Sequence, residues 1–248
     1  CRMASMGSGD AAMGTRYVGT PRAVRAWWSA GLAAAVGYGL ALAVIALGLP
    51  AGADLTGRFA GQPVAKSAMA LLLAVAALFH PIVRERRWLL GALLFSAAGD
   101  FFLAMPWWEP AFVCGLGAFL VAHLCFLGAL LPLRGNTGRV RQAAVAVVAV
   151  AFVVMLTRFW PNMVAEGLTV PVLIYMTVLG AMVTAALLAK LPTVWTALGA
   201  VFFAISDGMI GIGKFVLQSQ ALELPIWWAY AASMVLITAG FFFGRTRH

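Results

Sequence analysis

Three ionisable residues of the chain lie in the middle of long apolar stretches: Asp100, His123 and Asp207. A carboxylate at the centre of a bilayer costs a few kcal/mol, so an intramembrane acid indicates a functional site by default. Each of the three lies roughly a dozen residues beyond the start of its stretch, which at about 1.5 Å per residue is about 18–20 Å from the starting face and near the midplane. We therefore expect one shared pocket in which two aspartates and a histidine carry out acid–base catalysis.

A structural role is the alternative for each of these residues, because buried polar side chains also tie membrane helices together through hydrogen bonds. Small neighbours accompany both acids. Ser96 lies one turn before Asp100 on the same helical face, and Ser206 directly precedes Asp207. Small residues permit either close helix packing or room for a ligand. We take both serines as candidate substrate-binding residues.

Two lysines and a tyrosine near the ends of the apolar stretches are further candidates for substrate binding. Lys214 follows Asp207 by seven residues, which places it about 10 Å from the acid on nearly the same helical face. That spacing suits a cation that holds a phosphate while the acid acts on an adjacent chain. Lys66 can do the same from the second stretch, and Tyr175 can donate a hydrogen bond into the same cavity. Their alternatives are snorkelling to the interface for the lysines and belt packing for the tyrosine.

The composition of the chain is that of a membrane protein. Hydrophobic residues make up 63% of the 248 residues and charged residues 10%, and the mean hydropathy is +0.96. A soluble globule of this size needs a larger polar shell, so soluble enzymes and disordered chains are excluded. The net charge of +9 would suggest nucleic-acid binding in a soluble protein. Here the basic residues fall between apolar stretches, where the positive-inside rule explains them, so no nucleic-acid partner is expected.

An all-α bundle of about eight transmembrane helices is the predicted fold. Crossing the hydrocarbon takes about 20 apolar residues, and eight windows satisfy this: 27–49, 64–80, 88–105, 110–131, 140–157, 168–190, 194–217 and 225–243. Of the 17 Lys and Arg residues, 13 lie in the N-terminal tail, in alternate loops and at the C-terminal end. This asymmetry predicts that both termini are cytoplasmic. Short loops and Ala-rich, Arg-rich usage point to a bacterial inner membrane.

The domain organisation expected from this pattern is simple. We predict a disordered basic tail over residues 1–26, a single transmembrane domain over 27–244 and a short basic end over 245–248. The first apolar stretch is long enough to span and is expected to stay in the chain rather than to be cleaved as a signal peptide. Cys1 is an unusual first residue, and Met3 and Met6 are alternative starts.

Several of these stretches resemble the YhhN family of membrane lysoplasmalogenases. Residues 91–104, G-A-L-L-F-S-A-A-G-D-F-F-L-A, are similar to that family's G-x-L-x-F-S-x-x-G-D-x-x-L-A, and residues 112–124, F-V-C-G-L-G-A-F-L-V-A-H-L, to its F-x-x-G-L-x-A-F-x-x-A-H. Residues 170–175 match in the same way, as do 199–215, through an F-x-x-S-D core and a terminal K-F. The specificity of the match rests on S-x-x-G-D, A-H and S-D in this order and spacing.

The chain departs from the family pattern at two places. Lys66 is followed by Ser67 where the family usually has Pro, which puts the role of this lysine at the helix start in question. The last span ends I-T-A-G-F-F-F-G instead of the family's Tyr-Tyr and Gln-containing stretch. We therefore expect this helix to make no polar contribution to the site and the substrate range to differ.

The resemblance implies hydrolysis of the vinyl ether bond of lysoplasmalogens to a fatty aldehyde and glycerophospho-ethanolamine or glycerophospho-choline. This reaction needs a protonated carboxylic acid and a second group that stabilises an oxocarbenium ion, roles that two carboxylates at low dielectric can divide. Asp100 and Asp207 are the predicted catalytic acids, in either order, and His123 orients one of them or the attacking water. No cofactor is predicted, although two acids and a histidine on three helices are also compatible with zinc.

Two other classes of function fit the same residues. A lipid-binding protein or proton-coupled lipid carrier would also need buried acids, but the sequence has no inverted repeat and no pair of Gly/Pro-broken helices. A hydrolase of another lysophospholipid bond is the third class. Ser96 and Ser206 have no adjacent base in the sequence and no nucleophile motif around them, which disfavours ester hydrolysis. The expected partners are a lysophospholipid substrate and the lipid bilayer.

Overall fold

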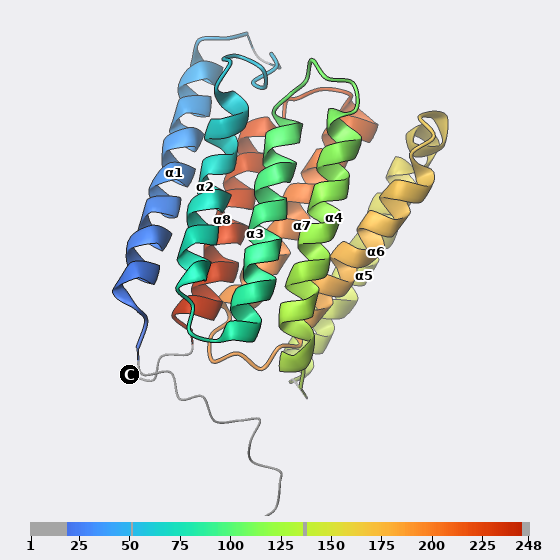
Figure 1. Cartoon of the computed structure of the whole chain (residues 1–248). Coiled ribbons are helices and arrows are strands. Elements are labelled where there is room, and N and C mark those ends of the chain that lie inside the picture. The colour runs from blue at the N-terminus through green and yellow to red at the C-terminus, as the bar shows by residue number, and fades with distance from the viewer. Residues whose placement is uncertain (1–18, 51, 136–137, 245–248) are drawn as a thin grey trace, which may run out of the picture.

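The computed structural model describes residues 19–50, 52–135 and 138–244, and this part of the chain consists of helices joined by short connections, with no strand (Figure 1). Eight long helices follow one another: α1 Arg22–Leu47, α2 Gln62–Leu78, α3 Val83–Leu103, α4 Ala111–Leu130, α5 Arg139–Ala165, α6 Thr169–Leu187, α7 Trp195–Ile212 and α8 Glu223–Phe242. A short 3-10 turn, η1 (Leu131–Leu133), extends α4, and a π-helical turn, η2 (Gly213–Leu217), extends α7. The prediction of an all-α fold is confirmed.

Six of these helices are long and apolar enough to cross a membrane: α1, α4, α5, α6, α7 and α8. The two remaining helices differ from them for simple reasons. α2 is apolar but has only 17 residues, and α3 begins with the charged run V-R-E-R-R. The protein is therefore a multi-pass membrane protein whose described part contains six strong candidate spans and two weaker ones.

With η2 counted as the end of α7, the observed helix bounds differ from the predicted ones by five residues or more at three ends. α3 begins at Val83 instead of 88. α1 begins at Arg22, so residues 22–26, which were assigned to the disordered tail, are helical. Residues 1–18 and 245–248, where the rest of the predicted tail and the basic end fall, lie outside the described residues. α5 continues through Pro161 to Ala165, beyond the predicted end at 157. Its last turns are held by packing of the buried Phe159 and Met163 and by a hydrogen bond from Asn162 to the Phe215 carbonyl, which together outweigh the lost proline N–H.

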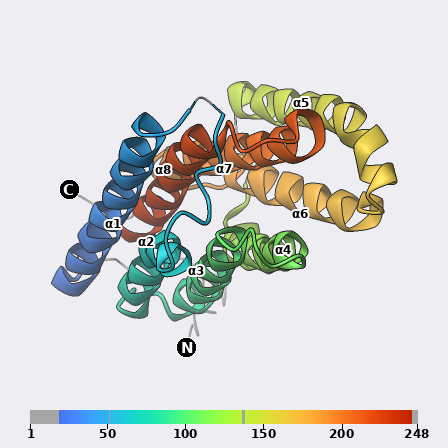
Figure 2. The ribbon, with the colours of Figure 1, turned by 90° about the horizontal axis from the view of Figure 1, so that it is seen from above.

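The helices form an up-and-down arrangement in which sequence neighbours pack side by side. α1 with α2, α2 with α3, α3 with α4 and α7 with α8 make the main contacts, and α6 packs against α4 and α7. Seen along the bundle, α8 lies inside the group formed by α1, α2, α3 and α7, whereas the α5–α6 hairpin lies at one edge (Figure 2). We call the end that carries the α1–α2, α3–α4, α5–α6 and α7–α8 turns the upper end, as in Figure 1.

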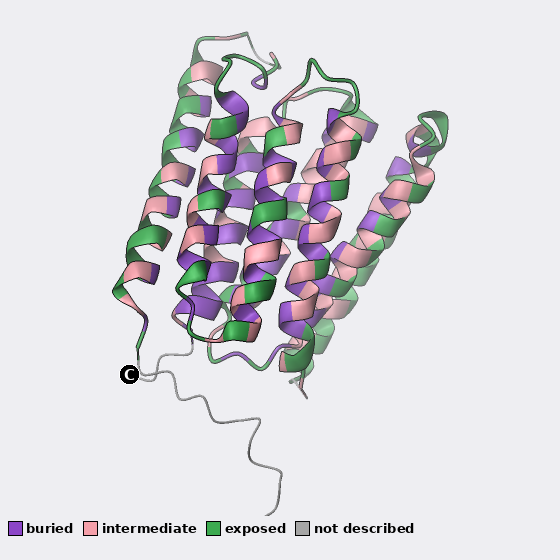
Figure 3. Ribbon diagram, viewed as in Figure 1, coloured by how far each residue is buried: buried purple, intermediate pink, exposed green. Residues whose placement is uncertain are grey.

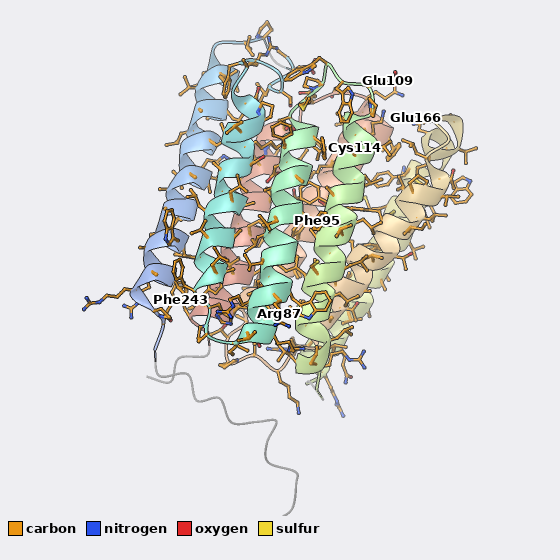
Figure 4. All side chains as sticks on the ribbon, in the orientation of Figure 1. Arg87, Phe95, Glu109, Cys114, Glu166 and Phe243 are labelled. Carbon is orange, nitrogen blue, oxygen red and sulfur yellow. The ribbon has the colours of Figure 1, made fainter. Side chains whose placement is uncertain are left out.

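Burial follows this arrangement. Twelve of the 20 residues of α8 are buried, whereas α5 buries only Phe159 and Met163 along its 27 residues (Figure 3). In a bilayer, the exposed apolar side chains of α5 face lipid. The acidic Glu109 and Glu166 lie toward the upper end and Arg87 at the lower end (Figure 4).

Candidate active site

Three of the predicted site residues meet in one cluster, formed by His123, Tyr175 and Asp207 from α4, α6 and α7. We call it the aspartate–histidine cluster. The Tyr175 hydroxyl donates to Asp207 Oδ2 at 2.5 Å, and His123 Nε2 lies 3.0 Å from the Tyr175 oxygen and 3.3 Å from Asp207 Oδ2. Because the tyrosine proton is given to the carboxylate, Nε2 is the donor in both of its contacts. The cluster therefore fixes the orientation of the Asp207 carboxyl group from two sides.

Asp100 lies in a different cluster with Lys66, Glu223 and Tyr230, from α3, α2 and α8. We call it the aspartate–lysine cluster. The Tyr230 hydroxyl donates to Asp100 Oδ2 at 2.7 Å, and Lys66 Nζ donates to Glu223 Oε1 at 3.0 Å. Lys66 and Glu223 are both electrostatic neighbours of Asp100. Asp100 is 1% exposed, so this acid is sealed inside the bundle.

Aromatic rings fill the space between the two clusters. Phe203 packs edge-on against His123 at 4.6 Å between ring centroids and against Tyr230 at 5.5 Å. Phe119 packs against both Phe203 and Tyr230. The expectation of one pocket shared by both acids is thus wrong as stated: sequence position gave the height of each residue along its helix, but not the direction in which its side chain points around the helix axis.

Gly99, the glycine of the S-x-x-G-D motif, has a packing role in this arrangement. A Cβ added at Gly99 would lie 2.5 Å from the ring of Phe119, closer than any real contact. The missing side chain therefore lets Phe119 of α4 lie against α3 next to Asp100. This glycine allows close helix approach rather than making room for a ligand.

The space beside Asp207 is an apolar cavity of about 420 Å³ between α4, α5, α6 and α7. Its walls are almost entirely aliphatic and aromatic side chains, with the polar groups of Asp207 and Tyr175 as the exceptions. A Cβ added at Gly208 would meet no atom within 4 Å, and Gly208 lines the cavity. The carboxyl group of Asp207 therefore faces a chamber that suits a hydrocarbon chain.

A second cavity, of about 520 Å³, lies at the upper end of the bundle and is polar. Both predicted substrate lysines line it, together with the acids Asp54, Glu166 and Glu223. Leu103, Phe112 and Ile210 line both cavities, so the polar and the apolar cavity adjoin. A molecule with a charged head and an apolar tail matches this pair of chambers.

The two predicted substrate lysines are both paired in the structure. Lys66 is buried and bound to Glu223, and Lys214 Nζ lies 2.7 Å from Glu166 Oε2 with side chains 39% and 30% exposed. The helix-start question at Lys66 also has an answer. Pro63 occupies the first turn of α2, where a proline is well tolerated, so the helix starts without a proline after the lysine.

The two serines lie away from the cavities. Ser206 Oγ donates to the Ile226 carbonyl at 3.2 Å and so ties α7 to α8. Ser96 is fully buried beside Tyr230. Neither serine lines either of the two cavities, so the structure gives both a packing position rather than a substrate contact.

The sequence analysis missed Tyr230, Glu223 and Glu166. The expectation that the last span makes no polar contribution is wrong, because α8 supplies Tyr230 to Asp100 and Glu223 to Lys66. The departure from the family pattern concerns only the end of that span, whereas both residues lie in its first half. The sequence held a signal for each of them. Tyr230 lies within an apolar stretch, and Glu223 and Glu166 lie within one helical turn of the start of such a stretch.

Comparison with known protein families assigns the chain to one of them. The model of the YhhN family matches residues 61–241. The chain belongs to the YhhN family. A lysoplasmalogenase of Mycobacterium tuberculosis is 58% identical over 227 residues, which is 91% of this chain and 87% of that protein, and the one of Mycobacterium bovis matches equally. The lysoplasmalogenase TMEM86B of Mus musculus is 33% identical over 153 residues, covering 60% of this chain and 62% of its own. No solved structure matches the chain.

Membership of the YhhN family confirms the resemblance that the motifs predicted. The matched region contains α2 to α8 almost completely, and with them both clusters, the apolar cavity and all of the polar cavity except Asp54 and Thr56. Apart from these two, all the site residues described above therefore lie within the part of the chain that matches the family.

Proposed function

We propose that this YhhN-family protein is a lysoplasmalogenase, which hydrolyses the vinyl ether bond of lysoplasmalogens to a fatty aldehyde and a glycerophospho-base. The observation that carries the proposal is the 58% identity, over nine-tenths of the chain, to proteins of that name. The adjoining apolar and polar cavities support it, because a lysoplasmalogen has one apolar chain and one charged head.

Vinyl ether hydrolysis begins with proton transfer to the alkene carbon that is not bonded to oxygen. The electrons of the double bond form the new C–H bond, and the ether oxygen stabilises the resulting oxocarbenium ion. Water then adds to the cation and loses a proton, giving a hemiacetal. The hemiacetal breaks into the aldehyde and the glycerol hydroxyl, so the net reaction consumes one water and the catalytic acid regains its proton.

Asp207 is the acid that we assign to the proton transfer, because of the two aspartates it is the one at the wall of the apolar cavity. In its protonated form it gives the proton to carbon. The carboxylate that remains then faces the oxocarbenium ion and accepts the proton of the attacking water. His123 and Tyr175, which both contact Oδ2 of Asp207, hold the group in place and stabilise the carboxylate during the cationic step.

Asp100 does not contact the substrate in this mechanism. It accepts a hydrogen bond from Tyr230, and the Tyr230 ring packs against Phe203, which in turn packs against His123, so Asp100 influences the aspartate–histidine cluster without touching the substrate. We assign it a positioning role and assign the phosphate to the polar cavity, where Lys66 and Lys214 lie. This division replaces the simpler hypothesis in which both acids touch the substrate.

The membrane arrangement that we propose has eight spans, with both termini in the cytoplasm of a bacterial inner membrane. The lysine and arginine asymmetry supports it, as do the acids at the upper end and Arg87 at the lower end (Figure 4). In this arrangement the polar cavity faces the periplasm. Labelling of single cysteines at Glu109 and at Arg139 with a membrane-impermeant reagent tests it: reaction at 109 and not at 139 is expected, and the reverse overturns the orientation.

The activity is tested by incubating detergent-purified protein with a lysoplasmenyl-ethanolamine and with its saturated alkyl-ether analogue. Aldehyde is expected from the vinyl ether alone, because only the alkene can be protonated at carbon. The lysophosphatidyl ester serves as a third substrate. Release of fatty acid from the ester, without aldehyde from the vinyl ether, would replace the proposal by ester hydrolysis. Binding of all three lipids without any product would replace it by a lipid carrier.

A further inference from the structure

The apolar cavity reaches the outer surface of the bundle along one side. Two of the side chains that line it are also well exposed: Val147 on α5, at 68%, and Ile205 on α7, at 47%. A side chain that faces both a cavity and the surroundings marks a place where the two meet. We call the line between these two helices the α5–α7 seam.

Packing across the α5–α7 seam is thin. α5 makes most of its contacts with α6 and η2 and few with α7. Its buried residues, Phe159 and Met163, lie in the upper third of the helix, whereas the part around Val147 meets the core only through half-buried side chains such as Val145 and Val148. Figure 2 shows the α5–α6 hairpin at the edge of the bundle. The wall of the cavity is therefore weakest where α5 passes α7 in its lower half.

The cavity is too short below Asp207 to contain a whole lipid chain. Its lower limit on α7 is Val201, six residues from Asp207, which is about 9 Å along the helix. A lipid chain spans about 15 Å, half of the hydrocarbon thickness. With the head in the polar cavity and the ether at Asp207, the far end of the chain does not fit inside.

We infer that the alkenyl tail of the substrate leaves the apolar cavity through the α5–α7 seam, between Val147 and Ile205, and ends in the lipid of the bilayer. This inference rests on the proposed function. The tail is apolar, the seam is lined by apolar side chains, and the bilayer beyond is equally apolar, so the passage requires no desolvation of polar groups. The substrate is then bound with its head and ether enclosed and its tail end in the membrane.

Selectivity for chain length follows from this geometry. The first part of the tail buries surface against the cavity walls, and each buried methylene contributes about 0.8 kcal/mol. Methylenes beyond the seam exchange one apolar environment for another and contribute little. The protein is therefore expected to discriminate against short chains and to accept long chains of different lengths equally.

Closing the seam tests the inference. The double variant Val147→Trp/Ile205→Trp places two large side chains across it. The matched control is Val150→Trp/Leu198→Trp, on the same two helices at residues of 64% and 47% exposure that do not line the cavity. The measurement is the ratio of kcat/KM for a lysoplasmenyl-ethanolamine of about 16 carbons to that for one of about 8 carbons, a difference of methylenes alone, in the same detergent.

The seam variant is expected to lower this ratio by at least about tenfold, the size of effect that excluded methylenes produce, whereas the control keeps the wild-type ratio. Equal loss for both chain lengths, or no change in the ratio, overturns the inference. Val147→Trp and Ile205→Trp alone give the same ratio test if the double variant does not fold. Failure of the proposed function is distinct, since wild-type protein would then release no aldehyde from either substrate.

Discussion

The two aspartates of the site occupy environments that differ in one respect that matters for catalysis. Asp207 is held by Tyr175 and His123 and faces an apolar cavity. Asp100 is held by Tyr230 and is sealed among α2, α3 and α8. Both are buried acids bonded to a tyrosine on a neighbouring helix, yet only one of them can touch a substrate in either of the two cavities.

This difference indicates how an apolar bundle can use two acids. The acid at the cavity exchanges protons with the substrate, and the sealed acid joins α3 to α8 through its hydrogen bond with Tyr230. Removing the first should affect the reaction much more than the fold. Removing the second should affect both.

The largest effect is expected for Asp207→Asn. The amide keeps the size of the side chain but cannot give a proton to carbon, so kcat should fall by about 10²–10⁴-fold, the usual contribution of a positioned acid. The measurement is aldehyde release from a lysoplasmenyl-ethanolamine. Glu109→Gln, at an exposed acid of the α3–α4 turn, is the control. Retention of more than a tenth of the wild-type rate by Asp207→Asn would remove this residue from the chemistry.

Filling the cavity beside Asp207 should give the next largest effect. In Gly208→Leu the new side chain enters open space that the proposal assigns to the alkenyl chain, so kcat/KM should fall by about 10–100-fold, as for other changes of a few carbons in an apolar pocket. The control is Gly117→Leu, which also meets open space but lies on the exposed face of α4 outside the cavity. If both variants keep full activity, the chain binds elsewhere.

A smaller effect on activity, together with a loss of stability, is expected at the sealed acid. Tyr230→Phe removes the donor to Asp100 and leaves a buried carboxyl group without it, which costs about 1–3 kcal/mol of stability. Asp100→Asn should lower kcat about tenfold, and the double variant should cost less than the sum of the single ones, since the two residues share one hydrogen bond. Additive losses in thermal unfolding and in kcat would contradict a coupled pair.

The helices were predictable from the sequence because each apolar stretch is long enough to mark a membrane helix without reference to the rest of the chain. All eight predicted stretches correspond to helices. The end of α5 was not predictable, because Trp160-Pro161-Asn162 has the composition of a turn, and the packing of Phe159 and Met163 against η2 is a tertiary effect. Composition predicts the number of helices better than the number of spans, because α2 is short and α3 begins with charged residues.

The candidate site was predictable in part. Asp100, His123, Asp207 and Tyr175 stand out because ionisable and phenolic groups are rare in apolar stretches, and the structure places all four inside the bundle. Their grouping was not predictable, because helical rise gives height but the rotation and packing of each helix decide which side chains meet. The contact between Tyr230 and Asp100 could therefore not be predicted from the sequence.

The smallest effect is expected at the exposed ion pair of the polar cavity. Lys214 and Glu166 are 39% and 30% exposed, so the pair contributes at most about 1 kcal/mol to stability, and Glu166→Gln should leave thermal unfolding nearly unchanged. In the proposed site Glu166 competes with the substrate phosphate for the Lys214 ammonium group. The variant should therefore lower KM by a few-fold, an effect of the same size as the lost pair, and added salt should reduce the difference. A higher KM in Glu166→Gln would show instead that the carboxylate helps to bind the head group. Glu166 would then be, like Asp207 and unlike Asp100, an acid that contacts the substrate.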